Sequence, residues 1–109
     1  MAHKYRAKPT IVDGIRFDSK KEAARYEGLR MLQLAGAISG LELQPRFDLH
    51  TQRPDGTTVK VGTYVADFTY VNMANGEIVT EDVKGMLTSM YRLKRKWMLI
   101  EHGISILET

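Results

Sequence analysis

Two stretches that favour β-strands, residues 63–72 and 77–84, flank the dipeptide Asn75-Gly76. Both are rich in Val, Ile, Thr and Tyr, and Asn-Gly is a strong signal for a tight hairpin turn. If Asn75 and Gly76 are the two central turn residues, position 74 faces 77, position 69 faces 82 and position 67 faces 84. The sequence therefore predicts an antiparallel strand pair with this register.

Three charged side chains share one face of the predicted hairpin. Side chains alternate across a strand, so Asp67, Asp82 and Lys84 lie on the same side. Two carboxylates beside an ammonium group are equipped to hold a divalent cation and to activate a water molecule. The alternative interpretation is an Asp82–Lys84 salt bridge on an exposed strand. Asp67 favours function, because an aspartate is unfavourable within a strand and two carboxylates brought together without a cation repel.

Glu81 competes with Asp82 for the position on this face. A one-residue bulge in the second strand would turn Glu81 toward the site in place of Asp82. Only Asp82 stands two residues before a lysine, so we rank it first.

The remaining chain predicts two helices and further strands. Asp13-Gly14 predicts a small hairpin over residues 10–17, and the Ser19–Glu22 spacing matches the capping box of a helix over residues 20–34. Period-two alternation predicts a half-buried strand over residues 41–49, and residues 104–107 read as a closing strand. A second helix is predicted over residues 88–101, with four apolar side chains in the core: Met90, Leu93, Trp97 and Ile100.

Length and composition place the chain among small globular proteins. The 109 residues are expected to form one domain, in which residues 1–9 are a basic N-terminal arm. The absence of cysteine excludes disulfides, thiolate catalysis and zinc–cysteine sites. No apolar run is long enough for a membrane span or a signal peptide, which predicts a cytoplasmic protein. The order of helix, strands, helix and strand predicts an α/β fold with a mixed central sheet flanked by helices.

Basic residues are concentrated at two places, and the formal net charge is +3. Such clusters favour a partner that carries phosphate groups, although a solvated tail and a solvated helix face are equally good explanations for each cluster alone. The predicted nucleic-acid-binding residues are Lys4, Arg6 and Lys8 in the arm, and Arg92, Lys94, Arg95 and Lys96 in the second helix.

Taken together, these residues resemble the PD-(D/E)XK nuclease superfamily, and within it a small phage-encoded branch near the Holliday-junction resolvases. In that superfamily a helix supplies an acidic residue, a strand supplies an aspartate, and a neighbouring strand supplies an acid-x-lysine pair. Here Glu22 lies on the first helix, Asp67 stands in Val-Ala-Asp-Phe, and Asp82-Val83-Lys84 forms the last pair. Ala66 replaces the proline of the superfamily name.

The resemblance implies a restriction-endonuclease-like αβββαβ core and a metal-dependent endonuclease that cuts branched or structured DNA during phage recombination in a bacterial host cell. It implies Mg²⁺, or Mn²⁺ in its place, bound by Asp67, Asp82 and the carbonyl group of Val83. Lys84 would act on the attacking water, and Glu22 would contact the metal through water or simply close the capping box. A homodimer is expected, because one small domain needs a second copy to cut two strands.

Two other functions remain open from the sequence. One is a nucleic-acid-binding accessory protein that keeps the nuclease fold without turnover. The other is a small structural protein whose carboxylates form a salt-bridge network.

Overall fold

The computed structural model describes residues 8–84 and 87–109. Its elements, in chain order, are β1 (Thr10–Val12), β2 (Ile15–Phe17), α1 (Lys20–Leu34), β3 (Ile38–Leu43), β4 (Arg46–Gln52), β5 (Thr58–Val65), β6 (Phe68–Asn72), β7 (Ile78–Asp82), α2 (Ser89–Trp97), the π-helical turn η1 (Met98–His102) and β8 (Leu107–Glu108).

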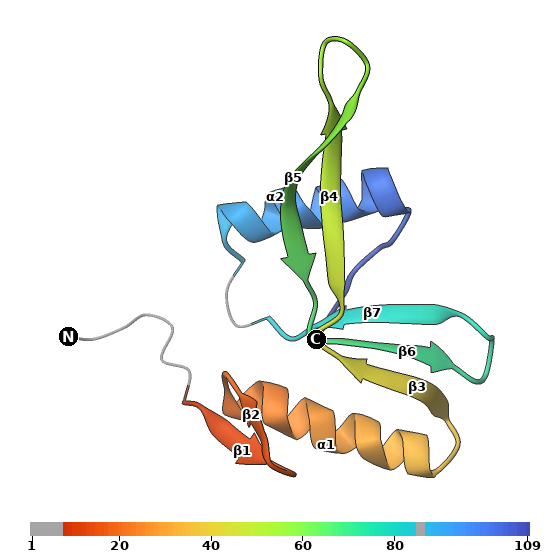
Figure 1. Ribbon diagram of the computed structural model, residues 1–109. Coiled ribbons are helices and arrows are strands. Elements are labelled where there is room, and N and C mark those ends of the chain that lie inside the picture. The colour runs from red at the N-terminus through yellow and green to blue at the C-terminus, as the bar shows by residue number, and fades with distance from the viewer. Residues whose placement is uncertain (1–7, 85–86) are drawn as a thin grey trace.

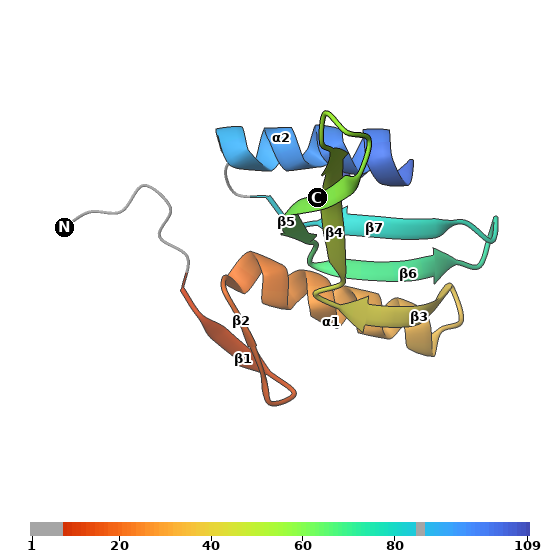
Figure 2. The same cartoon turned by 45° about the horizontal axis from the view of Figure 1, so that its top comes forward.

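A four-stranded sheet with the strand order β3-β6-β7-β8 forms the centre of the molecule. β8 runs parallel to β7, whereas the other neighbouring strands are antiparallel, so the sheet is mixed. β3, β6 and β7 lie between α1 and α2 in Figure 1, and β6 and β7 do so again in Figure 2. The predicted α/β class with a mixed sheet and flanking helices is confirmed at this level.

The N-terminal hairpin and α1 form as their local sequences predict. Val12 pairs with Ile15, and both turn residues between them have positive φ, 54° for Asp13 and 76° for Gly14, as a two-residue hairpin turn requires. Ser19 caps α1, because its side chain accepts a hydrogen bond of 3.1 Å from the backbone N–H of Glu22. Both elements are therefore confirmed, with the predicted boundaries of the helix.

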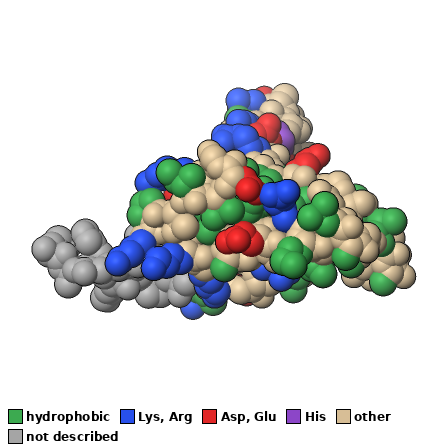
Figure 3. Space-filling view, turned by 90° about the horizontal axis from the view of Figure 1, so that it is seen from below, with side chains coloured by type: hydrophobic (Ala, Val, Ile, Leu, Met, Phe, Trp, Pro, Cys, Tyr) green, Lys and Arg blue, Asp and Glu red, His purple; other side chains and the backbone are tan. Residues whose placement is uncertain are grey.

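The core has two parts. The first lies between α1, the N-terminal hairpin and the sheet, and its buried residues include Ala23, Leu29 and Phe68. The second lies under α2 and includes Tyr64, Tyr91 and Met98. On the side of α1, hydrophobic side chains are scattered among charged ones at the surface (Figure 3). The site residues are found where these two parts meet.

Two predicted strands are each divided in the structure. The predicted strand over residues 41–49 breaks at Gln44, whose φ is +52°, and at Pro45. The strand predicted over residues 63–72 breaks at Ala66 and Asp67. The segments between these breaks, β4 and β5, pair only with each other. They form a two-stranded extension, the β4–β5 hairpin, that projects from the sheet (Figure 1). The prediction of one continuous strand in each place was wrong, because the alternation of apolar and polar residues continues across both breaks.

The predicted core stripe of the second helix is wrong at three of its four positions, whereas Trp97 is half-buried and packs against the second part of the core. Met90 is 60% exposed, Leu93 51% and Ile100 76%, whereas Tyr91 and Met98 are buried. The helix has a second stripe at positions 91, 94 and 98, and Lys94 on that stripe donates a hydrogen bond of 2.9 Å to the carbonyl oxygen of Thr63. The helix therefore buries mainly the adjacent side, displaced by one residue or about 100° around the axis. It continues through η1 to Gly103, whose φ is +67°.

The closing strand starts later than predicted, at Leu107. No helix within the described residues is long and apolar enough to cross a membrane.

Candidate active site

The β6–β7 hairpin has a register two residues away from the prediction. Thr69 pairs with Thr80 and not with residue 82. The loop is longer than two residues, because the N–H of Asn72 donates to the carbonyl of Glu77 at 2.8 Å and that of Gly76 donates to the carbonyl of Asn72 at 2.7 Å. Asn72 also accepts a hydrogen bond from the N–H of Ala74, which is turn chemistry that the prediction ignored.

An error of two residues preserves the face on which every side chain lies. Phe68 pairs with Glu81, so Asp67 comes opposite Asp82 when the register is continued by one position. Glu81 and Asp82 keep opposite faces, and the pairing from Phe68–Glu81 to Val71–Ile78 runs without a bulge.

Asp82 is the buried centre of the candidate site. One of its carboxylate oxygens, Oδ1, lies 3.1 Å from Nζ of Lys84. The other, Oδ2, accepts a hydrogen bond from the hydroxyl group of Tyr64. Asp82 is only 3% exposed, so its orientation is fixed by these two partners.

Asp67 lies at the break between β5 and β6, beside Asp82. Its Oδ2 atom accepts a hydrogen bond of 2.7 Å from the backbone N–H of Val83. Burial raises the pKa of Asp67 to about 8, with a further contribution from the hydrogen bond and charge of the Asp82 carboxyl group. The Asp67 carboxyl group is thus held beside Asp82 at a cost to its own ionisation, which is the electrostatic condition that a bound cation relieves.

The carbonyl group of Val83 faces the same side. The carbonyl of Asp82 accepts a hydrogen bond from Thr109, and the N–H of Lys84 donates one to Thr109. Backbone groups alternate in direction along an extended chain, so the N–H and C=O of Val83 both point away from Thr109. That N–H donates to Asp67, so the carbonyl of Val83 is also directed toward Asp67.

Lys84 is held by an aromatic ring as well as by Asp82. Its Nζ atom lies 4.0 Å from the centre of the Tyr91 ring, a cation–π distance. The hydroxyl group of Tyr91 donates a 2.6 Å hydrogen bond to Glu108, which is paired with Arg95 at 2.6 Å. The ring of Tyr91 is therefore fixed at both ends, and it presents the ammonium group of Lys84 to Asp82.

Glu22 is buried on α1, near the carboxylates. Burial raises the pKa of Glu22, and the negative charges of Asp18 and Asp82 act in the same direction. Lys84 acts in the opposite direction, so Glu22 lies within the electrostatic reach of both Asp82 and Lys84. The structure thus brings together Glu22, Asp67, Asp82, Val83 and Lys84 from three separate parts of the chain.

Glu81 has a structural partner on the other side of β7. Both of its oxygens are bound by Arg25, at 2.6 and 2.8 Å, and it also accepts hydrogen bonds from Tyr70 and Thr109. Burial opposes its ionisation, but the hydrogen bonds from Arg25 and Tyr70 outweigh burial and lower the pKa of Glu81. The ranking of Asp82 above Glu81 as the site residue is consistent with this arrangement.

Two residues of the site were not predicted. Tyr64 was missed because it stands three positions before Asp67, which would place it on the opposite face of one continuous strand. The break at Ala66 and Asp67 removes that restriction. Lys21, whose Nζ donates a 3.0 Å hydrogen bond to the carbonyl of Lys84, carries no sequence signal that distinguishes it from other helix-surface lysines.

The predicted phosphate contacts are distributed unevenly. Lys4 and Arg6 lie outside the described residues, and Lys8 is exposed before β1. Arg92 and Lys96 are exposed on α2, whereas Lys94 is bonded to the backbone and Arg95 is paired with Glu108. The structure therefore leaves Arg92 and Lys96 as the exposed cations of this helix.

The donor atoms at Asp67 and Asp82 fit Mg²⁺ or Mn²⁺. Within residues 8–84 and 87–109, no three His, Asp or Glu side chains are arranged as a complete metal cage. Mg²⁺ in phosphate-processing sites usually takes one or two carboxylates and completes its shell with waters and substrate oxygens. Two adjoining carboxylates and a backbone carbonyl on the same side meet that requirement.

Replacement of Tyr91 tests its hold on Lys84. We expect Tyr91→Leu to lower any cleavage rate constant about tenfold with little change in KM, because a cation–π contact is worth about 1 kcal/mol or more. Tyr91→Phe keeps the ring and is expected to retain most of the rate. Single-turnover kinetics measure both variants. Equal losses in the two would show that the ring does not position Lys84.

The chain belongs to the family described as "Protein of unknown function (DUF1064)", whose model matches residues 2–103. Neither a curated protein nor a solved structure matches the chain.

Proposed function

We propose that this protein is a metal-dependent endonuclease that hydrolyses phosphodiester bonds in DNA, with branched or structured DNA as its substrate. The observation that carries the proposal is the pair Asp67 and Asp82, placed side by side with Lys84 at 3.1 Å from Asp82. Two carboxylates that repel each other, and an ammonium group beside them, are the requirements of a metal-assisted attack on a phosphate.

The order of the elements gives separate support. When the β4–β5 hairpin is left out, the helices and the four strands of the central sheet follow one another as α1, β3, β6, β7, α2 and β8. This is the αβββαβ order that the resemblance to PD-(D/E)XK nucleases implies. Asp67 precedes β6, and Asp82 ends β7, two neighbouring strands of that sheet.

The roles of the side chains follow from their contacts. Asp67, Asp82 and the carbonyl of Val83 would hold the metal ion. When bound, that ion lowers the pKa of a water molecule and neutralises charge on the phosphate. Lys84 orients the attacking water and stabilises negative charge that develops on the phosphate oxygens. Tyr64 keeps Asp82 in one orientation, and Glu22 places water at the edge of the site.

A second candidate is a nucleic-acid-binding protein that has the fold without turnover. It is favoured by the contacts of Asp82, whose two oxygens are already engaged by Tyr64 and Lys84. Under this alternative, the same network serves only to hold β7 in place.

Cleavage assays separate the two candidates. A labelled four-way junction and a linear duplex are incubated with the protein in Mg²⁺, in Mn²⁺ and in EDTA. The nuclease proposal predicts cuts in the junction with either metal and none in EDTA. Stable binding of the junction without cuts in either metal would support the non-catalytic binder instead.

We include a homodimer in the proposal, because one site cuts one strand and paired cuts across a junction need two. Sedimentation velocity of the protein with and without a junction measures this directly. A single copy bound to each junction would contradict it.

A further inference from the structure

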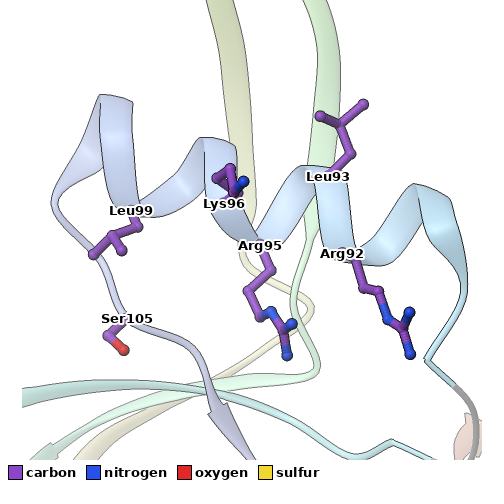
Figure 4. A pocket seen from close by; sticks show the side chains of 6 residues that line it. All are labelled: Arg92, Leu93, Arg95, Lys96, Leu99 and Ser105. Atoms are coloured by element: carbon purple, nitrogen blue, oxygen red, sulfur yellow. The ribbon is translucent and has the colours of Figure 1, made fainter.

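A groove runs along one side of α2, and its lining does not include Asp67 or Asp82. Its volume is about 570 Å³, within the range of sites that take small ligands. Figure 4 shows Arg92 and Arg95 extending from α2 in the same direction, with Leu99 close to Ser105 on the segment that follows η1. Leu93 and Lys96 complete the lining.

The charge of the groove selects an anionic ligand. Three of its six lining residues are cations, and among residues 8–84 and 87–109 Arg95 is the one of the three that has an ion-pair partner, Glu108. Arg92 and Lys96 are four residues apart, which is about 6 Å along a helix axis. One strand of a nucleic acid carries a phosphate for about every 3.4 Å of axial rise, so two phosphates separated by two steps, about 6.8 Å of rise, come close to this spacing.

The leucines of the groove narrow the choice of ligand further. Leu93 is 51% exposed and Leu99 is 55% exposed, so both present apolar surface to whatever occupies the groove. A duplex keeps its bases stacked inside and offers mainly phosphates to such a helix face. An unpaired strand offers phosphates together with the apolar faces of its bases, which also stack on guanidinium groups.

The groove is joined to the candidate active site through side chains. Arg95 on its wall is paired with Glu108, Glu108 accepts the hydroxyl group of Tyr91, and the Tyr91 ring contacts Lys84. A strand that lies in the groove therefore contacts the same network that holds Lys84.

We propose that the α2 groove binds an unpaired nucleic-acid strand, with its phosphates on Arg92 and Lys96 and its bases against Leu99. The inference rests on the proposed function for its substrate class, and it names the feature that the protein selects, a single-stranded segment beside the cut. A branched substrate with an unpaired arm, such as a flap or a fork, supplies such a segment, whereas an intact duplex does not.

Fluorescence anisotropy tests the groove without any cleavage. The probes are a labelled oligothymidylate and a blunt duplex of equal length, both in EDTA. The test protein is the double variant Arg92→Ala/Lys96→Ala, and the matched control is Arg53→Ala in the loop between β4 and β5. The double variant is expected to bind the oligothymidylate about tenfold more weakly. Its salt dependence should fall by about 1.4 in slope, about 0.7 for each of two lost phosphate contacts.

A third variant, Leu99→Ser, separates bases from phosphates. We expect it to weaken binding of the oligothymidylate about threefold and to leave binding of the duplex unchanged. If the double variant binds both probes like Arg53→Ala, the groove is not a nucleic-acid site. If the double variant loses equal affinity for the strand and for the duplex, and Leu99→Ser has no effect, the groove contacts phosphates only and does not distinguish an unpaired strand. A change in sedimentation of free Leu99→Ser, with strand binding intact, would make it a protein interface.

These outcomes are independent of the nuclease proposal. If the parent protein cuts no DNA but the groove variants lose strand binding, the groove stands and the nuclease fails. If the parent protein cuts junctions and the groove variants bind normally, the nuclease stands and the groove fails.

Discussion

Asp82→Asn is expected to lower metal-dependent cleavage of a four-way junction about a thousandfold. Asparagine keeps the size of aspartate and can still accept the hydrogen bond from Tyr64, so the fold should be retained. It removes the negative charge that would hold the metal ion, which corresponds to about 4 kcal/mol of transition-state stabilisation. Single-turnover cleavage with saturating Mg²⁺ measures the loss.

Asp48→Asn is the matched control for this substitution. Asp48 lies on β4, where it pairs with Lys60 at 3.2 Å and both side chains are half exposed. We expect Asp48→Asn to cut at close to the parental rate. If Asp82→Asn also cuts like the parent, the site assignment is wrong even if the protein is a nuclease.

Arg25→Met is expected to cause the largest loss of stability, about 3 kcal/mol or more in the free energy of unfolding. Glu81 is fully buried, and Arg25 binds both of its oxygens. Removal of one partner of such a pair leaves a buried carboxylate without its counter-charge. Urea unfolding at neutral pH measures the effect. Arg16→Met, which removes the partner of Asp18 in an exposed pair, should change stability by less than about 1 kcal/mol.

The same pair predicts a dependence on pH. The pKa of Glu81 in the folded protein is lowered from its ordinary value of 4.5. Its contribution to stability is therefore fully present above pH 4.5 and is lost as the pH falls through the lowered pKa. The difference in stability between the parent and Arg25→Met should shrink below pH 4.5. A difference that stays constant down to pH 3 would show that the ion pair does not account for the effect.

Local signals in the sequence were sufficient for part of the fold. The Asp13-Gly14 turn and the capping residue Ser19 each determine the conformation of their neighbours, so the first hairpin and α1 could be predicted closely. The β4–β5 hairpin could not be predicted, because its start and end depend on breaks at Gln44 and at Asp67 that interrupt no hydrophobic pattern. Two strands that leave the sheet together are a tertiary feature.

The second helix shows the limit of periodicity. Two stripes at helical spacing lie on α2. The more apolar one is exposed at Met90 and Leu93, although Trp97 on the same stripe packs against the core. The buried stripe is selected by contacts with distant residues, above all Tyr91 with Lys84 and Lys94 with Thr63. A stripe of apolar residues therefore indicates a helix more reliably than it indicates which side of the helix is buried.

The candidate site could be predicted further than its surroundings. A register error of two residues does not change the face of the sheet on which a side chain lies. Asp67 and Asp82 were therefore expected on one face, although the predicted pairing of positions was wrong. Tyr64 could not be found in this way, because side chains alternate regularly between the two faces only within one continuous strand.

Metal binding at the two carboxylates is the most direct test of the account. Isothermal titration of Mn²⁺ into the parent protein and into Asp67→Asn measures it without any DNA. The account predicts one binding site per chain in the parent and a loss of affinity of at least tenfold in Asp67→Asn, because one of the two carboxylate ligands has lost its charge. Equal affinity in the two proteins would place the metal ion elsewhere and would contradict the proposed active site.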